Sequence, residues 1–246
     1  MRRSKLPTRG SPLNLNTFSI AAHDPVSSMF GICVSTRVPA VGAICPYARA
    51  GVGAVVTQAR ANPLFGIDGL DLLEKSYGAE ETLEMLLHLD QEPERRQLIV
   101  IDAQGHPAAY TGAGTDPWRG HHTGDNYAVA GNLLVGEATI TAMAEAFEDS
   151  EGKWFTERLM RALEAGQAAG GDRRGKQSAA IYVVHTEPYP YLDLRVDEHP
   201  DPVAELRRIY EIVKVDLMPL VERLPTRANP EGDLGDETLG TVLREE

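Results

Sequence analysis

A hydroxyl residue at the start of a predicted strand is the feature of this sequence best suited to hydrolytic chemistry. Thr17 opens the apolar run 17–22, which ends at the turn Asp24-Pro25. If the peptide bond between Asn16 and Thr17 were cut, Thr17 would carry a nucleophile, its hydroxyl, and a base, its own α-amine. In an uncut chain the same residue is only a β-branched residue that favours a strand. The function of the protein therefore depends on one bond.

Three side-chain amides stand at predicted strand ends or in loops, namely Gln58, Asn62 and Asn132. Amide groups in such places suit the stabilisation of an oxyanion or the recognition of a substrate amide. Hydrogen bonding within a turn explains the same residues equally well. We expect Asn132, which follows Gly131, to stabilise the oxyanion, and Gln58 and Asn62 to contact the substrate.

Basic residues give a second set of candidate contacts. Arg37 follows the second predicted strand and suits bidentate binding of a substrate carboxylate, although a simple turn cluster is as good an explanation. Arg49 lies among small apolar residues, where a cation must be paired or line a pocket, and we favour the pocket. The glycine-bracketed loop 170–178 contains Asp172 and Arg173, which we expect to bind an anionic ligand or a second subunit.

The sequence predicts neither a metal site nor a cofactor. His121 and His122 are adjacent, so on an extended chain their side chains point in opposite directions. The two cysteines, Cys33 and Cys45, are far from C-x-x-C spacing, and no phosphate-binding G-x-x-x-x-G-K-[ST] loop is present. We expect the cysteines to be buried thiols.

Composition narrows the class of protein. The chain has 246 residues, 42% of them hydrophobic, as in ordinary globular proteins, and a formal net charge of −12, which argues against a nucleic-acid partner. No apolar run approaches the length of a membrane span, and the basic segment 1–16 lacks the apolar centre of a secretory signal. We therefore expect a cytoplasmic protein with no membrane contact.

The order of predicted elements favours an α+β fold. Strands and helices come in blocks rather than in strict alternation, which is typical of antiparallel sheets packed against helices. The predicted strands are 17–23, 29–36, 51–58, 97–102, 106–111, 127–132, 178–184 and 192–197, and the predicted helical segments are 62–77, 79–89, 137–165 and 201–224. We divide the chain into a disordered leader (1–16), one domain (17–200), a C-terminal helix (201–224) and a flexible acidic tail (225–246).

Several stretches in order resemble one family. They are Thr17-Phe18-Ser19-Ile20-Ala21, Ala40-Val41-Gly42-Ala43, Ala48-Arg49-Ala50-Gly51-Val52-Gly53, Arg96-Gln97-Leu98, Val129-Ala130-Gly131-Asn132, the loop 165–175 and Asp201-Pro202-Val203. Over residues 17–210 the chain resembles the DUF1028 family of the N-terminal-nucleophile (Ntn) hydrolase-like superfamily. The resemblance implies a four-layer αββα sandwich, with two antiparallel sheets between helical layers. It also implies that Thr17 is a nucleophile and that Ser35 lies beside it.

Two hypotheses from different classes follow. In the first, the protein is an Ntn-type amidohydrolase that cleaves an amide bond in a small, possibly acidic metabolite or peptide, after the chain has been cut before Thr17. In the second, it is a non-catalytic ligand-binding or scaffold protein in which Thr17 stays internal. A hydrolase that uses the same pocket without an N-terminal nucleophile is a third option. In each case we expect a homo-oligomer.

Overall fold

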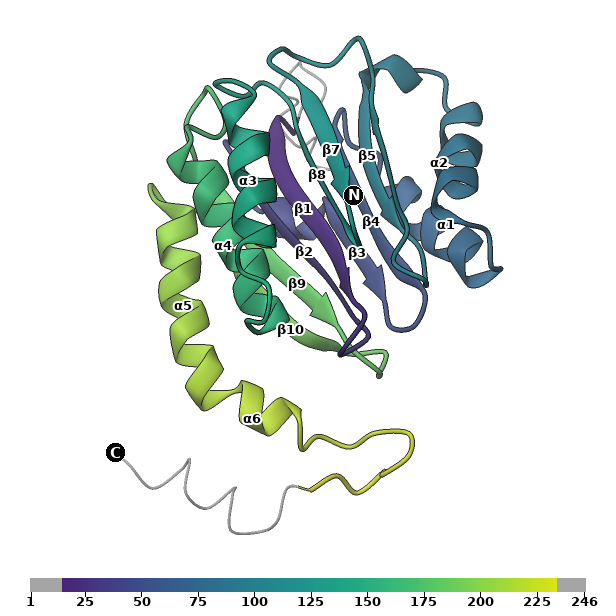
Figure 1. The fold of residues 1–246 in the computed structure, drawn as a ribbon, viewed down its shortest axis with the longest axis vertical. Helices are drawn as coiled ribbons and strands as arrows, with labels where there is room; N and C mark the ends of the chain where they lie inside the picture. The colour runs from purple at the N-terminus through teal and green to yellow at the C-terminus, as the bar shows by residue number, and fades with distance from the viewer. Residues whose placement is uncertain (1–14, 234–246) are drawn as a thin grey trace, which may run out of the picture.

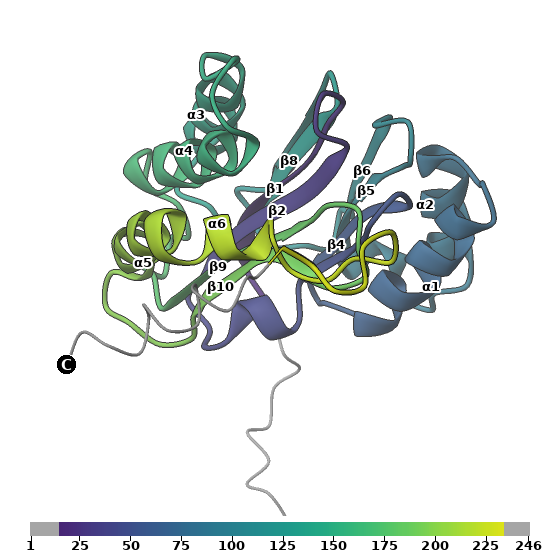
Figure 2. The same ribbon diagram turned by 90° about the horizontal axis from the view of Figure 1, so that it is seen from below.

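The computed structural model describes residues 15–233, and its elements form four layers (Figures 1 and 2). The six-stranded sheet has the order β10 (Pro190–Val196), β9 (Ser178–Val184), β2 (Met29–Thr36), β1 (Thr17–Asp24), β8 (Tyr127–Gly131) and β7 (Gly120–Gly124). The four-stranded sheet has the order β3 (Pro46–Arg49), β4 (Gly53–Ala59), β5 (Arg96–Ile101) and β6 (Pro107–Thr111). Within each sheet every pair of neighbouring strands is antiparallel.

Helices cover the outer face of each sheet. On the six-stranded sheet lie α3 (Ala138–Glu148), α4 (Phe155–Ala168) and α5 (Pro202–Asp216), followed by the short α6 (Met218–Val221); on the four-stranded sheet lie α1 (Pro63–Glu74) and α2 (Ala79–His88). Two 3-10 turns, η1 (Val41–Ala43) and η2 (Pro93–Arg95), complete the elements of the described residues. The predicted αββα sandwich is confirmed.

The register of the first hairpin decides which side chains face the other sheet. In the β1–β2 pair, Thr17 lies opposite Thr36, and Phe18 lies opposite Ser35. Because side chains alternate along a strand, Thr17 and Thr36 share one face of the sheet, and Phe18 and Ser35 share the other. The first face meets the four-stranded sheet, and the second meets the helices.

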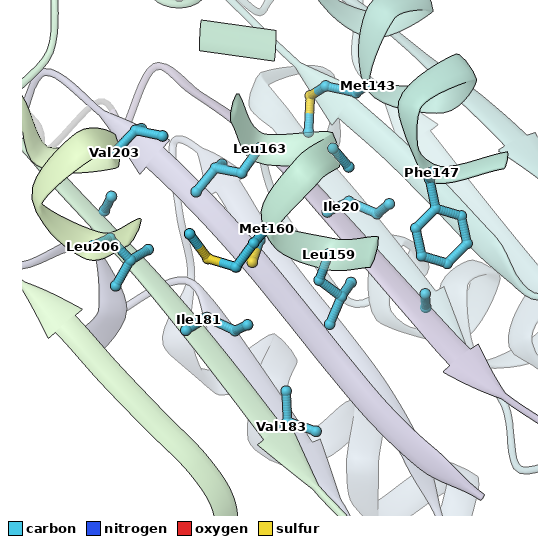
Figure 3. Packing of buried hydrophobic residues seen from close by; sticks show 14 of the residues in the cluster. Ile20, Met143, Phe147, Leu159, Met160, Leu163, Ile181, Val183, Val203 and Leu206 are labelled. Atoms are coloured by element: carbon cyan, nitrogen blue, oxygen red, sulfur yellow. The ribbon is translucent and has the colours of Figure 1, made fainter. Parts of the chain in front are cut away.

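The outer face of the six-stranded sheet carries the largest apolar cluster. Figure 3 shows Leu159, Met160 and Leu163 of α4 lying over side chains of the strands, among them Ile20 and Ile181. These side chains are fully buried, so this layer determines which residues of β1 face the helices. Because side chains alternate along a strand, it also determines which residues of β1 face the other sheet.

The space between the sheets is apolar over most of its length. Ala21 and Ile32 of the large sheet pack there against Val56 and Ile99 of the small one. Toward the start of β1 this apolar packing gives way to buried polar side chains, which are Thr17, Ser19, Thr36, Gln58, Gln97 and Asn132. The candidate site lies at that end.

Some boundaries differ from the sequence-based prediction. The strands β3 and β7 were not predicted, and the helical segment 137–165 is two helices, α3 and α4, separated by a turn with Gly152 at φ +82°. At the other end of the domain, the predicted C-terminal helix 201–224 divides into α5 and α6.

The predicted leader and tail are only partly described. Leu15 and Asn16, which we had assigned to a disordered leader, are buried parts of the fold, and Leu15 pairs with Ala59 of β4. The first residues of the predicted tail also make contacts, since the Tyr189 hydroxyl donates to the carbonyl of Pro225. Residues 1–14 and 234–246 of those two segments lie outside the described residues. No helix within residues 15–233 is long and apolar enough to cross a membrane.

Candidate active site around Thr17

Thr17 begins β1 with its side chain fully buried. Its hydroxyl donates a hydrogen bond to the carbonyl of Leu15, with an oxygen–oxygen distance of 2.7 Å. The hydroxyl is therefore directed back toward the residues that precede it, on the side of the peptide bond between Asn16 and Thr17. A nucleophile aimed this way lies next to the bond whose cleavage would expose its amine.

The carbonyl oxygen of Asn16 accepts two hydrogen bonds. Thr36 donates from Oγ1 at 2.6 Å, and Arg174 donates from Nη2 at 3.0 Å. One donor comes from the strand opposite Thr17, and the other comes from the loop before β9. Two convergent donors on one carbonyl oxygen polarise that carbonyl and are arranged to stabilise negative charge on it.

Arg174 is held in place by Asp172. The buried carboxylate of Asp172 accepts from Arg174 Nη2 at 2.7 Å and Nε at 3.1 Å, and also from the backbone N–H groups of Arg174 and Arg37. Gly171 (φ +58°) and Gly175 (φ +104°) allow the tight loop that brings these groups together. Asp172 thus positions the guanidinium rather than contacting Asn16 itself.

A buried polar network joins the two sheets beside Thr17. Gln97 of β5 is its centre: Gln97 Oε1 accepts from Gln58 Nε2 and Asn132 Nδ2, both at 2.8 Å, and Gln97 Nε2 donates to the Gly131 carbonyl at 2.8 Å. Ser19 Oγ donates to Gln58 Oε1 at 2.7 Å. Each of these amides is almost completely buried, so their hydrogen bonds replace the water that they lose.

Asn132 connects this network to Thr17. Its backbone N–H donates to the Thr17 carbonyl at 3.0 Å, while its side-chain oxygen, also buried, has no hydrogen-bond partner among the described residues. An unpaired buried acceptor is costly and marks a place where a further donor would bind. Asn132 therefore lies next to the candidate nucleophile with one acceptor free, while its side-chain N–H group is used by Gln97, and its part in stabilising an oxyanion stays a prediction.

Of the residues predicted from the sequence, the structure brings four together, namely Thr17, Gln58, Asn132 and Asp172. Ser35 is not among them. It lies on the helix-facing side of β2, opposite Phe18, and its hydroxyl donates to the Ser178 carbonyl at 3.2 Å. The hydroxyl on the Thr17 side of β2 is that of the next residue, Thr36, because one step along a strand reverses the face.

Arg49 does not line a pocket near Thr17. Its guanidinium pairs with Asp71 at 3.0 Å and Glu74 at 2.7 Å, both on α1. Arg49 shares its face of β3 with Tyr47, which packs in the cluster against α1 and α2. The alternative interpretation, a structural ion pair, describes Arg49 better.

Three other predicted contacts have structural partners outside the site. Asn62 caps α1, where its side-chain oxygen accepts from the N–H of Leu64. Arg37 is exposed and donates to Gln177, and Arg173 donates from Nη2 to the carbonyl of Leu134 at 3.2 Å. For Asn62, the turn hydrogen bond that the sequence left open is the one formed.

Three residues of the site, Thr36, Gln97 and Arg174, were missed as candidates. The register of the hairpin identifies Thr36, once Thr17 is taken as the first residue of β1. A lone amide at the head of the apolar run 97–101 indicates Gln97, because a buried polar residue is the informative exception in such a run. Nothing in the sequence distinguishes Arg174 from Arg173, since loop geometry decides which of them points inward.

A large cavity lies away from Thr17. It has a volume of ≈ 1110 Å³ and is lined by His23 and Asp24, at the far end of β1, together with Trp154 and Tyr191. Asp24 is seven residue steps along the extended strand from Thr17, a distance of about 23 Å. The surroundings of Thr17 are closed instead, because Leu15 and Asn16 occupy them. Among residues 15–233, no group of three His, Cys, Asp or Glu side chains is placed to hold a metal ion.

A protein of this fold and arrangement has clear relatives. The model of a family of unknown function, DUF1028, matches residues 17–206, so the chain belongs to that family. It is similar to the crystal structure of protein SPO2555 from Silicibacter pomeroyi, also of DUF1028, with a TM-score of 0.81 and 29% identity over 89% of this chain and 99% of that chain.

A second solved structure is more distant. It is Anbu, described as an ancestral beta-subunit, from Yersinia bercovieri, with a TM-score of 0.36 and 12% identity over 85% of this chain and 98% of that chain. No curated protein matches the chain.

Proposed function

We propose that this protein is a self-processing amidohydrolase whose nucleophile is Thr17. The observation that carries the proposal is the pair of donors on the Asn16 carbonyl, from Thr36 and Arg174, beside a Thr17 hydroxyl directed toward the same residues. A peptide carbonyl held in this way is the one that Thr17 would attack to free its own amine. The resemblance of the sequence to the DUF1028 family, of the Ntn-hydrolase-like superfamily, supports the same chemistry.

Self-processing would take two steps. The Thr17 hydroxyl adds to the Asn16 carbonyl carbon, the C–N bond breaks, and the hydroxyl proton is transferred to the nitrogen of Thr17, which becomes a free amine. Water then hydrolyses the ester on Thr17 Oγ1, which releases a carboxylate on Asn16 and restores the hydroxyl. During the addition the negative charge develops on the oxygen that Thr36 and Arg174 already contact.

The freed amine would then act as the base for external substrates. Arg174 Nη2 is 3.0 Å from the Asn16 oxygen, so it lies within about 5 Å of the Thr17 nitrogen. A positive charge at that distance favours the neutral, basic form of the amine. The expected substrate is a peptide or a small amide, whose acyl group forms an ester on Thr17 before water releases it.

Intact-mass measurement of the purified full-length protein tests the proposal. We expect loss of residues 1–16, no loss in Thr17→Ala, and retained loss in Thr17→Ser, which keeps a hydroxyl at the same place. The processed protein should hydrolyse amide substrates that the Thr17→Ala protein leaves intact. An uncut wild-type chain at all times would contradict the proposal.

One observation favours a second candidate function, a non-catalytic ligand-binding or scaffold protein. Leu15 and Asn16 are buried, and Leu15 exchanges two backbone hydrogen bonds with Ala59, at 2.6 and 2.9 Å, so the uncut chain is itself a well-packed state. For such a protein we expect the intact mass of the full-length chain and no hydrolysis of amide substrates. An uncut chain that still hydrolyses amides would point to the third option, a hydrolase without an N-terminal nucleophile.

The homo-oligomer stays a prediction, which light scattering after size-exclusion chromatography tests.

A further inference from the structure

The two residues before Thr17 are held as an extended peptide in a specific place. Leu15 forms a short antiparallel bridge with Ala59, in which each residue donates its N–H to the carbonyl of the other. The Leu15 side chain is fully buried in a cluster with Val34, Val41, Cys45 and Ala180. We call this cluster the Leu15 pocket.

The next residue brings its carbonyl to the donors. The Asn16 oxygen accepts from Thr36 and Arg174, so the backbone from Leu15 to Asn16 is held at both ends. One end is fixed by strand pairing and apolar burial, and the other by two polar donors. This is how a peptide is bound when main-chain hydrogen bonds give affinity and a pocket for an alternate side chain gives selectivity.

We propose that this segment marks the acyl subsites of the enzyme, so that its substrates are peptides with an apolar residue immediately before the residue whose carbonyl is attacked. The inference rests on the proposed function. The ester made when Thr17 attacks Asn16 is the same bond as the acyl-enzyme ester made from an external substrate. The acyl group of a substrate must therefore lie where Leu15 and Asn16 lie, once the leader has left.

The chemistry of the subsites follows from the residues on the page. The Leu15 pocket is formed by aliphatic side chains and one buried thiol, so it favours a branched aliphatic side chain and rejects a charged one. Ala59 offers one backbone donor and one acceptor, which require a peptide bond on the substrate at that point. A small metabolite without a second residue would lose both.

Three acetylated dipeptide anilides test the pocket with the processed wild-type protein: acetyl-Leu-Asn, acetyl-Ala-Asn and acetyl-Asp-Asn linked to aminomethylcoumarin. We expect kcat/KM for the leucine substrate to exceed that for the alanine substrate by about 10-fold or more, as for pockets that sort aliphatic groups. The aspartate substrate should fall roughly 100-fold below the leucine one, because its charge would lose water in an apolar pocket.

A pocket variant makes the assignment specific to these residues. Val41→Ala enlarges the Leu15 pocket and should raise kcat/KM for an acetyl-Phe-Asn anilide relative to the leucine one by roughly 10-fold. Val203→Ala is the matched control. Val203 is also a buried valine, but it belongs to α5 and packs in the cluster between the helices and the six-stranded sheet. This substitution should leave the ratio unchanged.

A measurement that needs no variant uses the leader itself. The synthetic peptide 1–16, which ends in a free carboxylate at Asn16, should inhibit hydrolysis competitively. The same peptide with aspartate at position 15 should not inhibit at tenfold higher concentration.

The outcomes separate this inference from the proposed function. A processed, active protein that hydrolyses the three anilides equally, or that is inhibited equally by both peptides, overturns the subsites and leaves the Thr17 mechanism standing. A chain that is never processed overturns the proposed function, and the subsites with it. The intact mass tells the two cases apart.

Discussion

At the scale of single residues, the Asn16 carbonyl receives one neutral donor and one charged donor, which are held by different means. Thr36 is fixed by the β1–β2 register, while Arg174 depends on the carboxylate of Asp172. A donor fixed by a strand is already in place when negative charge develops, so removing it should act on the rate rather than on the fold.

We predict that Thr36→Val, which keeps the shape of the side chain, slows self-cleavage by about 100-fold, the usual effect of removing one oxyanion donor. The rate is measured from intact mass over time after purification. Ser35→Ala is the control, because Ser35 is the neighbouring hydroxyl on the opposite face of β2. Equal slowing by both substitutions would mean that the hydroxyl of Thr36 has no special place in the reaction.

His23, at the other end of β1, gives a prediction about pH. It is buried, and its ring stacks on Phe30 with centroids 4.5 Å apart. Burial lowers the pKa of His23 below its ordinary value of 6.5, while the Asn126 side chain and the carboxylates of Asp24 and Asp102 act in the opposite direction. The folded state therefore takes up this proton at lower pH than the unfolded state does.

The sign follows from that difference. Well above pH 6.5 the imidazole is neutral in both states and the histidine has no effect on stability. As the pH falls through about 6.5, the unfolded state binds the proton first and the protein loses stability, until the pH is below the folded-state pKa. We predict that His23→Phe, which keeps the stacked ring, loses less unfolding free energy than the wild type between pH 7.5 and pH 5. Urea denaturation at the two pH values measures this. An equal loss of unfolding free energy in the wild type and in His23→Phe would contradict the prediction.

At the scale of elements, the polar network holds the two sheets together at the Thr17 end. Gln97 is bonded to side chains or carbonyls of four other strands: Gln58 on β4, Thr111 on β6, Gly120 on β7, and Gly131 at the end of β8. A network of this kind is stable only while every member is satisfied, and removing its centre leaves several buried groups unpaired.

We predict that Gln97→Leu lowers the free energy of unfolding by about 3 kcal/mol, because it leaves amides of Gln58 and Asn132 without a partner. Guanidinium denaturation followed by circular dichroism measures the change. Gln104→Leu is the matched control, since Gln104 is exposed in the turn between β5 and β6. A loss no larger than that of the control would show that water replaces the network.

The elements also show how far the sequence alone could lead. Strands with apolar alternation or continuous apolar runs, such as β1, β2 and β5, were predictable because burial on at least one face imposes a pattern. The edge strands β3 and β7 were not. β7 reads Gly-His-His-Thr-Gly, and an edge strand with little buried surface need not show any periodicity.

The site was predictable only in part, for a geometric reason. Thr17 and Asn132 stand at the ends of β1 and β8, which pair in the sheet, so residue type and position sufficed to choose them as neighbouring candidates. Ser35 and Thr36 differ by one step in register, which exchanges the faces of a sheet, and a resemblance in sequence does not fix that step. Arg49 was ambiguous because its partners, Asp71 and Glu74, approach only when α1 packs on β3.

At the scale of the whole molecule, the residues before Thr17 serve two purposes at once. In the proposed function they are the segment to be removed, and they are also part of the folded core, since Leu15 is fully buried and paired with Ala59. Burial of one leucine side chain is worth about 2 kcal/mol, and each backbone hydrogen bond adds about 1 kcal/mol. Processing should therefore open the site at a cost in stability.

We predict that the processed wild-type chain unfolds with a free energy about 4 kcal/mol below that of uncut Thr17→Ala, which retains the leader and both Leu15–Ala59 hydrogen bonds, and that its melting temperature is lower by roughly 8–16 °C. Calorimetry on both proteins measures this. Added peptide 1–16 should restore part of the loss, because a ligand that binds only the folded state stabilises it by mass action. Leu15→Ala in the uncut Thr17→Ala background is the control, and it should reproduce the part of the loss in unfolding free energy that is due to the Leu15 side chain. Equal melting temperatures before and after processing, with the cleaved peptide shown by mass spectrometry to have left, would mean that the pocket around Leu15 closes by itself.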